Sequence, residues 1–182
     1  MKRVEFLLIQ LEGFLFLNYP NILDFFNDSL EDTNDNGDDD LRLFYKWRNG
    51  SKINSIRSIG ICQFCSFGYF LPLGESNQYQ KTFNEENYFN KNYFPFVASL
   101  GGDFLLIDKT KKKSKVYLYS PNLLVNEPLV IYNNIECFIE TVYESFIQRA
   151  YKYNHEFYLE VNDELEKRIS QKLNDKSQFW ND

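Results

Sequence analysis

Residues 93–108, YFPFVASLGGDFLLID, decide the fold of this chain. An apolar run leads to a pair of glycines, and the strongly apolar segment 104–107 comes shortly after them. Glycine adopts positive φ angles without steric cost, so Gly101 and Gly102 predict a tight turn. A phosphate-binding loop is disfavoured, because the pair lacks a GxxxxGK(S/T) or GxGxxG context and precedes a strand instead of a helix. The segment therefore predicts a structural turn that feeds a buried strand.

The segments after this turn predict an antiparallel hairpin. Residues 104–107 and 116–119 are both apolar, and they flank a lysine-rich connection at 109–115 that fits the tip of a β-hairpin. Lysines at a hairpin tip most often protect β-structure from edge pairing, so we do not assign them to a phosphate or RNA. Residues 129–132 predict one more strand.

The last third of the chain predicts helices. Asn133 is a suitable N-cap with Glu136 three residues later, as in a capping box, and apolar residues recur at helical spacing over 135–146. A break at 153–156 precedes a final helix, 162–174, whose narrow apolar stripe we expect to pack on the domain.

The N-terminal part predicts helices as well. Residues 3–17 are apolar almost throughout, which makes helix and buried strand hard to separate, and we favour a helix with a weak point at Gly13. Pro20 suits the first turn of a second helix, whose rough apolar stripe runs over 22–30.

The middle of the chain predicts a short helix followed by strands. Residues 41–48 place their large apolar side chains on one helical face, and Gly50 is well placed as a C-terminal cap. Short strands are expected within 59–71, and the polar, Asn-rich stretch 76–92 is expected to be a loop with some local helix. The prediction is a single α+β domain over 1–182, a mostly antiparallel sheet flanked by N- and C-terminal helices.

Composition narrows the functional class. Of the 182 residues, 43% are apolar and 18% aromatic, which predicts a globular domain with a proper core. The net charge of −6 argues against a nucleic-acid-binding protein and favours a cationic partner. Charged residues interrupt the apolar N-terminus, and no run is long enough to span a bilayer. Three cysteines form no disulfide framework, so we expect a cytoplasmic protein with reduced thiols and no membrane association.

The stretch 32–40 is strongly acidic and predicts a solvated loop. Its first six residues, DTNDNG, match the first half of a calcium-binding EF-hand loop. The twelfth position should carry a glutamate but holds Leu43, and Asp39 takes the usually apolar eighth position. We therefore prefer a solvated loop over a weak calcium site. Its functional form would be a recognition patch for a basic protein.

Candidates for catalysis or metal binding are few. Cys62 and Cys65 form a C-x-x-C, but their flanks predict a strand, which points the two thiols to opposite faces. Buried structural cysteines are therefore favoured over a zinc or redox site. His155 is the only histidine, and no motif around it predicts a Ser-His-Asp or Cys-His site. We expect no enzymatic activity, no metal and no cofactor.

Several short motifs occur in a fixed order between residues 19 and 150. They are YKWRNGS at 45–51 (with Trp47, Asn49 and Gly50), FLPL at 70–73, Phe94 and Pro95, the turn Gly101-Gly102-Asp103, KVYLYS at 115–120, and the helix at 135–146. Their order and spacing resemble the SUKH superfamily, which includes fungal cell-wall-synthesis regulators and many bacterial immunity proteins.

The resemblance implies an α+β domain without common catalytic residues. Bacterial SUKH members look like immunity proteins, which bind a cognate polymorphic toxin and block it, and many such toxins are basic nucleases. The acidic charge of this chain fits that expectation. The hypothesis is a cytoplasmic immunity protein that binds its toxin stoichiometrically. A non-enzymatic scaffold or regulator without a toxin partner is the alternative. The sequence specifies no oligomeric state.

Two groups of residues are predicted to contact the partner. The first would steer a basic toxin electrostatically and consists of Asp35, Asp38, Asp39 and Asp40. The second would supply aromatic anchors and consists of Tyr79, Tyr88 and Phe89. The alternative for the aromatic group is a loop pinned onto the core by its own side chains, and the sequence favours neither interpretation.

Overall fold

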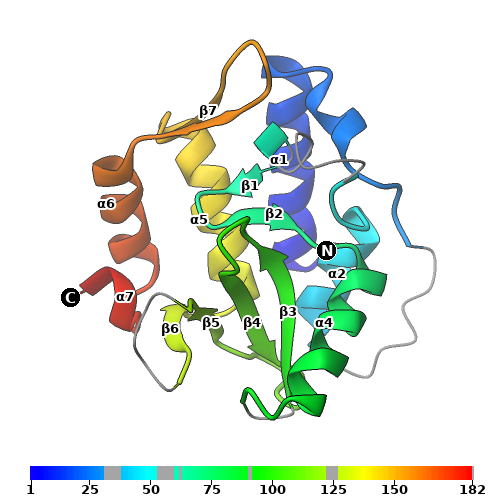
Figure 1. The fold of residues 1–182 in the computed structure, drawn as a ribbon. Coiled ribbons are helices and arrows are strands. Elements are labelled where there is room, and N and C mark those ends of the chain that lie inside the picture. The colour runs from blue at the N-terminus through cyan, green and yellow to red at the C-terminus, as the bar shows by residue number, and fades with distance from the viewer. Residues whose placement is uncertain (31–37, 53–59, 62, 90–91, 122–126, 182) are drawn as a thin grey trace.

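The computed structural model describes residues 1–30, 38–52, 60–61, 63–89, 92–121 and 127–181. Figure 1 shows an antiparallel sheet with helices around it, which confirms the predicted α+β class. The helical elements are α1 (Arg3–Asn18), η1 (Ile22–Phe25), α2 (Asp39–Trp47), α4 (Leu73–Glu85), α5 (Ile135–Ile147), α6 (Asp163–Leu173) and α7 (Gln178–Asn181). The strands are β1 (Gln63–Cys65), β2 (Gly68–Phe70), β3 (Tyr93–Ala98), β4 (Phe104–Asp108), β5 (Val116–Tyr119), β6 (Leu129–Tyr132), β7 (Tyr151–Tyr153) and β8 (Leu159–Val161).

The main sheet is a meander in which each strand pairs with the next, in the order β1-β2-β3-β4-β5-β6. Its centre is the β3–β4 pair, with Phe94 opposite Ile107 and a bulge between Pro95 and Val97. The predicted hairpin of β4 and β5 is confirmed, as is the strand β6. Each strand therefore pairs with its neighbours in sequence. Because β3 and β4 are the third and fourth of the six strands, the segment 93–108 lies at the middle of the sheet.

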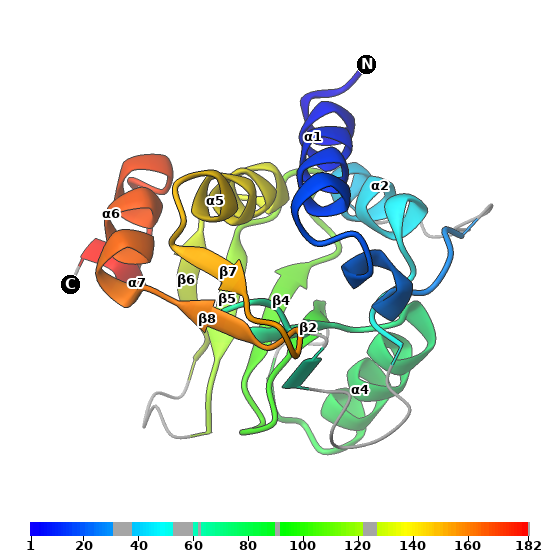
Figure 2. The same ribbon diagram turned by 90° about the horizontal axis from the view of Figure 1, so that it is seen from above.

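Both faces of the sheet are covered. On one face, Phe96 and Leu105 belong to the main core with α1, α2 and α5. On the other face, Phe104 and Leu106 pack with Phe83 of α4 in a second, largely aromatic cluster. Figure 2 shows α1, α2 and α5 on one side of the sheet and α4 on the other. Coverage on both sides explains why β4 is buried at all five positions and has no polar alternation until Asp108.

Four details differ from the sequence prediction. The stretch 73–85 is a regular helix, α4, and not a loop with local helix. The expected second helix over 22–30 is only the 3-10 turn η1. The break expected at 153–156 is the turn of a small antiparallel hairpin, β7–β8. The N-cap of α5 is Asn134, whose side chain accepts a hydrogen bond from the amide of Cys137, so the prediction of Asn133 was wrong by one residue.

The two ends of the chain pack on this domain as helices. The favoured assignment of residues 3–17 is confirmed, because α1 lies against α2 and α5. The last predicted helix is confirmed as α6, with Asn162 as its N-cap and α5 as its packing partner.

Candidate partner-binding surface

Residues of the YKWRNGS motif, at the end of α2 and just after it, contact helix α1 and the start of α4. Asn49 Oδ1 accepts a hydrogen bond from the amide of Leu73 at 2.9 Å, so a distant side chain satisfies a free donor at the start of α4. Gly50 has φ +76°, and a Cβ placed there would lie 2.3 Å from the backbone nitrogen of Pro72. Trp47 donates its indole N–H to Glu12 of α1 at 2.9 Å. Trp47 and Asn49 therefore connect the end of α2 to α1 and to the start of α4. Gly50 adopts the predicted left-handed conformation, but the C-cap of α2 is Arg48.

The second motif builds the β3–β4 turn. Ser99 Oγ accepts hydrogen bonds from the amides of Gly101 and Asp103 at 3.1 and 3.0 Å, and it donates to the Asp103 carboxylate at 2.8 Å. Gly102 has φ +84°, a conformation that L side chains rarely adopt. Phe94 and Pro95 are buried in β3. This geometry confirms the predicted structural turn, whose side chains Ser99 and Asp103 form hydrogen bonds within the turn.

Asp38, the first described residue of the acidic stretch 32–40, is not solvated. Asp38 is only 2% exposed. Its Oδ1 accepts from the amides of Asp40 and Leu41, which caps α2, and its Oδ2 accepts from the amide of Ser114 at 3.0 Å. The prediction of a solvated loop through residue 40 was therefore wrong for Asp38, because its carboxylate ties α2 to the β4–β5 connection. Asp35 lies outside the described residues.

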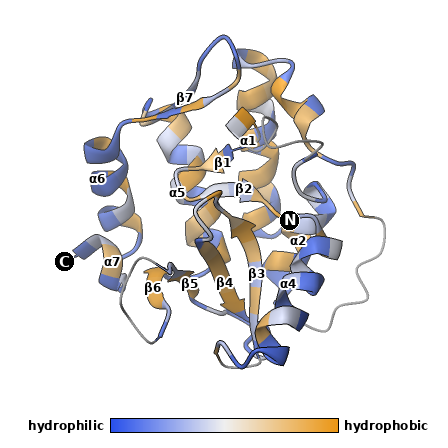
Figure 3. Cartoon of the chain, viewed as in Figure 1, coloured by the Kyte–Doolittle hydropathy of each residue, from blue (hydrophilic) through white to orange (hydrophobic). Residues whose placement is uncertain are grey.

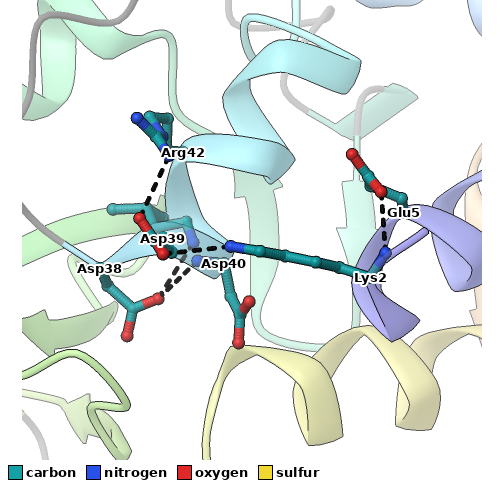
Figure 4. Close-up of polar contacts among 7 residues, drawn as sticks. Lys2, Glu5, Asp38, Asp39, Asp40 and Arg42 are labelled. Atoms are coloured by element: carbon teal, nitrogen blue, oxygen red, sulfur yellow. Dashed lines mark hydrogen bonds and ion pairs between the residues drawn. The ribbon is translucent and has the colours of Figure 1, made fainter.

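The next two acidic residues lie in the first turn of α2. Figure 4 shows Lys2 reaching from the N-terminus to Asp39, which also pairs with Arg42. The hydrogen bond from Lys2 is the main cause that lowers the pKa of Asp39. Asp40 is half-buried, and desolvation raises the pKa of its carboxyl.

Basic residues from distant parts of the chain surround this acidic turn. A surface hollow of about 370 Å³ is lined by Lys2, Arg3, Asp39, Asp40, Lys112, Lys113 and Glu136. The sequence from 24 to 40 contains no basic residue, so sequence reasoning predicted an unopposed negative patch. The fold instead brings the lysines of the β4–β5 connection and the N-terminus to the same place.

The predicted aromatic anchors lie together at the end of α4. Tyr79, Tyr88 and Phe89 all pack around Phe83, with ring centroids 6.2, 6.0 and 4.9 Å away. Tyr88 is 52% exposed, whereas Tyr79 and Phe89 are partly buried against the second cluster. Tyr93, Tyr117 and Tyr119 of the sheet continue the same surface. We call these six residues the aromatic face: Tyr79, Tyr88, Phe89, Tyr93, Tyr117 and Tyr119.

The structure does not bring the two predicted groups together. The aromatic face lies on the α4 side of the sheet, and the start of α2 lies on the side of α1 and α5 (Figure 2). Sequence reasoning also missed Tyr93, Tyr117 and Tyr119, although their alternation along β3 and β5 could have placed them on one face.

Two reactive groups, Cys65 and Glu166, are buried in the interior, whereas Cys62 of the C-x-x-C lies outside the described residues. Burial raises the pKa of the Cys65 thiol to about 12, which makes it an inert core residue. Glu166 of α6 is 3% exposed and accepts hydrogen bonds from Tyr151 and from Ser66 Oγ, the latter at 2.5 Å. Desolvation raises the pKa of this carboxyl. The trio fastens α6 to the β1–β2 turn.

Within the described ranges, no three His, Cys, Asp or Glu side chains are grouped as a metal site would require. His155 is exposed in the β7–β8 turn. Among the same residues, no helix has the length and apolar character needed to cross a bilayer.

A comparison with known protein families decides the identity of the fold. The model of the SMI1/KNR4 family (SUKH-1) matches residues 38–141, which is more than half of the chain. The chain belongs to the SUKH-1 family. The search of curated proteins found no significant match.

The SUKH-1 match runs from the cap of α2 to the middle of α5. It confirms the resemblance found in the motifs, over a narrower range than the predicted 19–150. SUKH domains are generally non-enzymatic, and membership of this family suggests a role in protein–protein interaction. The elements α1, η1, β7, β8, α6 and α7 lie outside the match.

Proposed function

We propose that this chain is a cytoplasmic immunity protein that neutralises a cognate polymorphic toxin by stoichiometric binding and without catalysis. The observation that carries the proposal is the aromatic face on a SUKH-1 domain. Tyrosine has an apolar ring and a polar hydroxyl, so it serves surfaces that are wet when free and buried when bound.

The aromatic face is rigid enough to serve as an anchor. Tyr88 leaves half of its surface to solvent while its ring contacts Phe83 and Phe89. Phe89 in turn packs edge-on against Tyr119 with ring centroids 4.8 Å apart. A side chain already held by its neighbours loses little rotamer freedom on binding, which raises the affinity that its contact area can supply.

The charge around the aromatic face favours a basic toxin. Glu85 and Glu86 are exposed at the end of α4, just before Tyr88, and Glu75 lies near its start. Lys81 of the same helix pairs with Glu85, so three acidic residues stand against one basic residue there. Opposite charge at the rim of an interface mainly speeds association and excludes wrong partners, while the buried aromatic rings supply the affinity. Asp39 and Asp40 remain candidates for a separate steering patch.

The test is co-expression of this chain with the toxin encoded beside its gene. Wild-type protein should protect the cells, and calorimetry should give a one-to-one complex. Tyr88→Ala should weaken binding about tenfold or more, the loss expected for an interface anchor. The matched control is Leu100→Ala, which removes a side chain that is 64% exposed in the β3–β4 turn.

Two results would oppose the proposal. Failure of the folded wild-type protein to protect cells from that toxin would reject toxin neutralisation. Equal loss of binding in the Tyr88 and Leu100 variants would reject the aromatic face as the contact surface. Recovery of several housekeeping proteins and no toxin in a pull-down would favour the scaffold alternative.

A further inference from the structure

Helix α1 has two apolar faces, and only one of them is covered. Its inner face, formed by Val4, Leu7, Leu8, Leu11 and Leu15, is buried against the rest of the domain. Its outer face exposes Phe6 at 45%, Ile9 at 56%, Phe16 at 61% and Leu17 at 81%. Figure 2 shows α1 between α5 and α2 in the helical layer, and Figure 3 shows its apolar composition. A surface helix normally turns a polar face to water.

The exposed residues form one stripe along the helix. Phe6, Ile9, Gly13 and Phe16 are three, four and three residues apart, which is the spacing of a helix-pairing seam. Leu17 borders the seam. We call these five residues the α1 stripe: Phe6, Ile9, Gly13, Phe16 and Leu17. A continuous apolar patch of this kind on a monomer is often functional.

Gly13 makes the stripe self-complementary. A Cβ at Gly13 would meet no atom within 4 Å, so the stripe has a shallow gap at its centre. When a second α1 lies antiparallel, Ile9 of one copy faces Gly13 of the other, and Phe6 faces Phe16. A projecting side chain then fills a gap, and this match occurs twice because a two-fold axis relates the copies.

Electrostatics favour a second copy at this place. The chain carries a net charge of −6, so two copies repel one another at most approaches. The α1 stripe contains no charged residue. The two acidic residues beside it are already engaged within the chain: Glu12 with Trp47 and Arg48, and Glu5 with the Lys2 amide. Pairing along the stripe therefore buries no unpaired charge.

The exposed area fits a weak dimer. With about 200 Å² for each large apolar side chain, the stripe offers on the order of 450 Å² per copy. Two copies would bury about 900 Å², below the 1,200–2,000 Å² of a standard interface. A neighbouring apolar hollow of about 420 Å³ adds Met1, Leu43 and Trp47 at its rim.

We propose that the α1 stripe is a homodimer interface in which two α1 helices lie antiparallel, with Ile9 of each copy over Gly13 of the other. The dimer is expected to be weak, because its interface is smaller than a standard one. The interface lies on the opposite side of the sheet from the aromatic face, so the dimer leaves that face open.

The deciding variant is Gly13→Lys. Glycine inside a helix costs about 1 kcal/mol relative to good helix formers, and the site has open space, so the lysine should make the monomer more stable to heat. The same charge inside the seam should abolish the dimer. Sedimentation velocity over a concentration series measures association. Asn77→Lys adds an equal charge to an exposed position of α4 and should leave the dimer intact.

Orientation is tested by thiol crosslinking. Phe6→Cys and Phe16→Cys are purified separately, mixed and oxidised, with wild-type protein as the background. The antiparallel arrangement predicts mixed 6–16 disulfides in excess over either homodimer. Preferred homodimers would reject this register.

A wild-type chain that stays monomeric up to about 1 mM, where association would contribute under roughly 4 kcal/mol, would overturn the dimer. So would a dimer that survives Gly13→Lys. Loss of toxin binding in Gly13→Lys with a monomeric wild type would assign the stripe to the toxin instead. The first two outcomes are read from association of the chain alone and are independent of whether it protects cells.

Discussion

Replacing Gly50 by alanine tests whether the Asn-Gly of the YKWRNGS motif is a structural joint. At φ +76° the residue occupies the left-handed region, where an L side chain is strained. The added Cβ would also lie 2.3 Å from the nitrogen and 2.5 Å from the Cα of Pro72. Both are backbone atoms, so no side-chain rotation can relieve the overlap, and the connection between α2 and α4 must shift.

The magnitude follows from two separate costs. The left-handed conformation costs an alanine about 1–2 kcal/mol. Overpacking against a fixed neighbour adds typically 1–3 kcal/mol. We expect Gly50→Ala to lower the free energy of unfolding by about 2–5 kcal/mol, a large share of the roughly 5–15 kcal/mol of a typical domain. For a chain of this length the melting temperature should fall by roughly 4–20 °C.

Urea denaturation followed by circular dichroism measures the change, with thermal melting as a second readout. The matched control is Gly13→Ala, the same substitution inside α1, where nothing lies within 4 Å of the new Cβ. That variant should raise stability by up to about 1 kcal/mol, because alanine is the better helix former. The two substitutions should thus have opposite signs. A Gly50→Ala protein within about 0.5 kcal/mol of wild type would refute the reasoning.

Three further predictions concern buried titratable groups. Asp38→Ala should cost about 1–3 kcal/mol in urea denaturation, because it removes the α2 cap and leaves the Ser114 amide without its acceptor, whereas the exposed Asp39→Ala should change stability little. Burial raises the pKa of Glu166, so its protonated form favours the folded state; that stabilisation is complete below the ordinary value of 4.5 and is lost as pH rises through the folded-state pKa. The unfolding free energy of Glu166→Gln, relative to wild type, should therefore increase from about pH 4 to about pH 8, and a flat difference would contradict this. Cys65, in a variant lacking the other cysteines, should resist iodoacetamide at pH 8 until the protein is denatured, because its pKa is about 12.

The sequence predicted best those elements whose signal is local. The β3–β4 segment combines a continuous apolar run with a glycine turn, and α5 has clear helical periodicity. The helix α4 was missed because glycine, serine and asparagine, which are weaker helix formers, make its sequence look like a loop. Its spacing of Ser76, Tyr79 and Phe83 did indicate a helix, and tertiary packing of those residues on the sheet overrides the weak propensity.

The candidate site was harder to predict, because its electrostatics depend on long-range contacts. Asp38 lies in an acidic run, yet its carboxylate is buried by Ser114, which is far away in the sequence. Lys2 and Lys113 approach the same turn from opposite directions along the chain. Composition alone cannot separate an acidic residue that caps a helix from one that is free to meet a partner, because both occur in the same polar stretch.

The motifs that identify the family therefore have a different role from the surfaces proposed for function. Asn49, Gly50 and Gly102 each satisfy a backbone requirement, and they leave no polar group directed toward a partner. These backbone requirements occur where elements meet or the chain turns, and they place no demand on the exposed surfaces. The aromatic face and the α1 stripe lie on opposite sides of the sheet. The α1 stripe contains no motif residue, and the aromatic face shares only Tyr117 and Tyr119 with the KVYLYS motif. Substitutions in these two surfaces should therefore change binding or association without lowering stability much, whereas substitutions at the joints should lower stability. Measuring both properties for Tyr88→Ala, Gly13→Lys and Gly50→Ala separates scaffold from function.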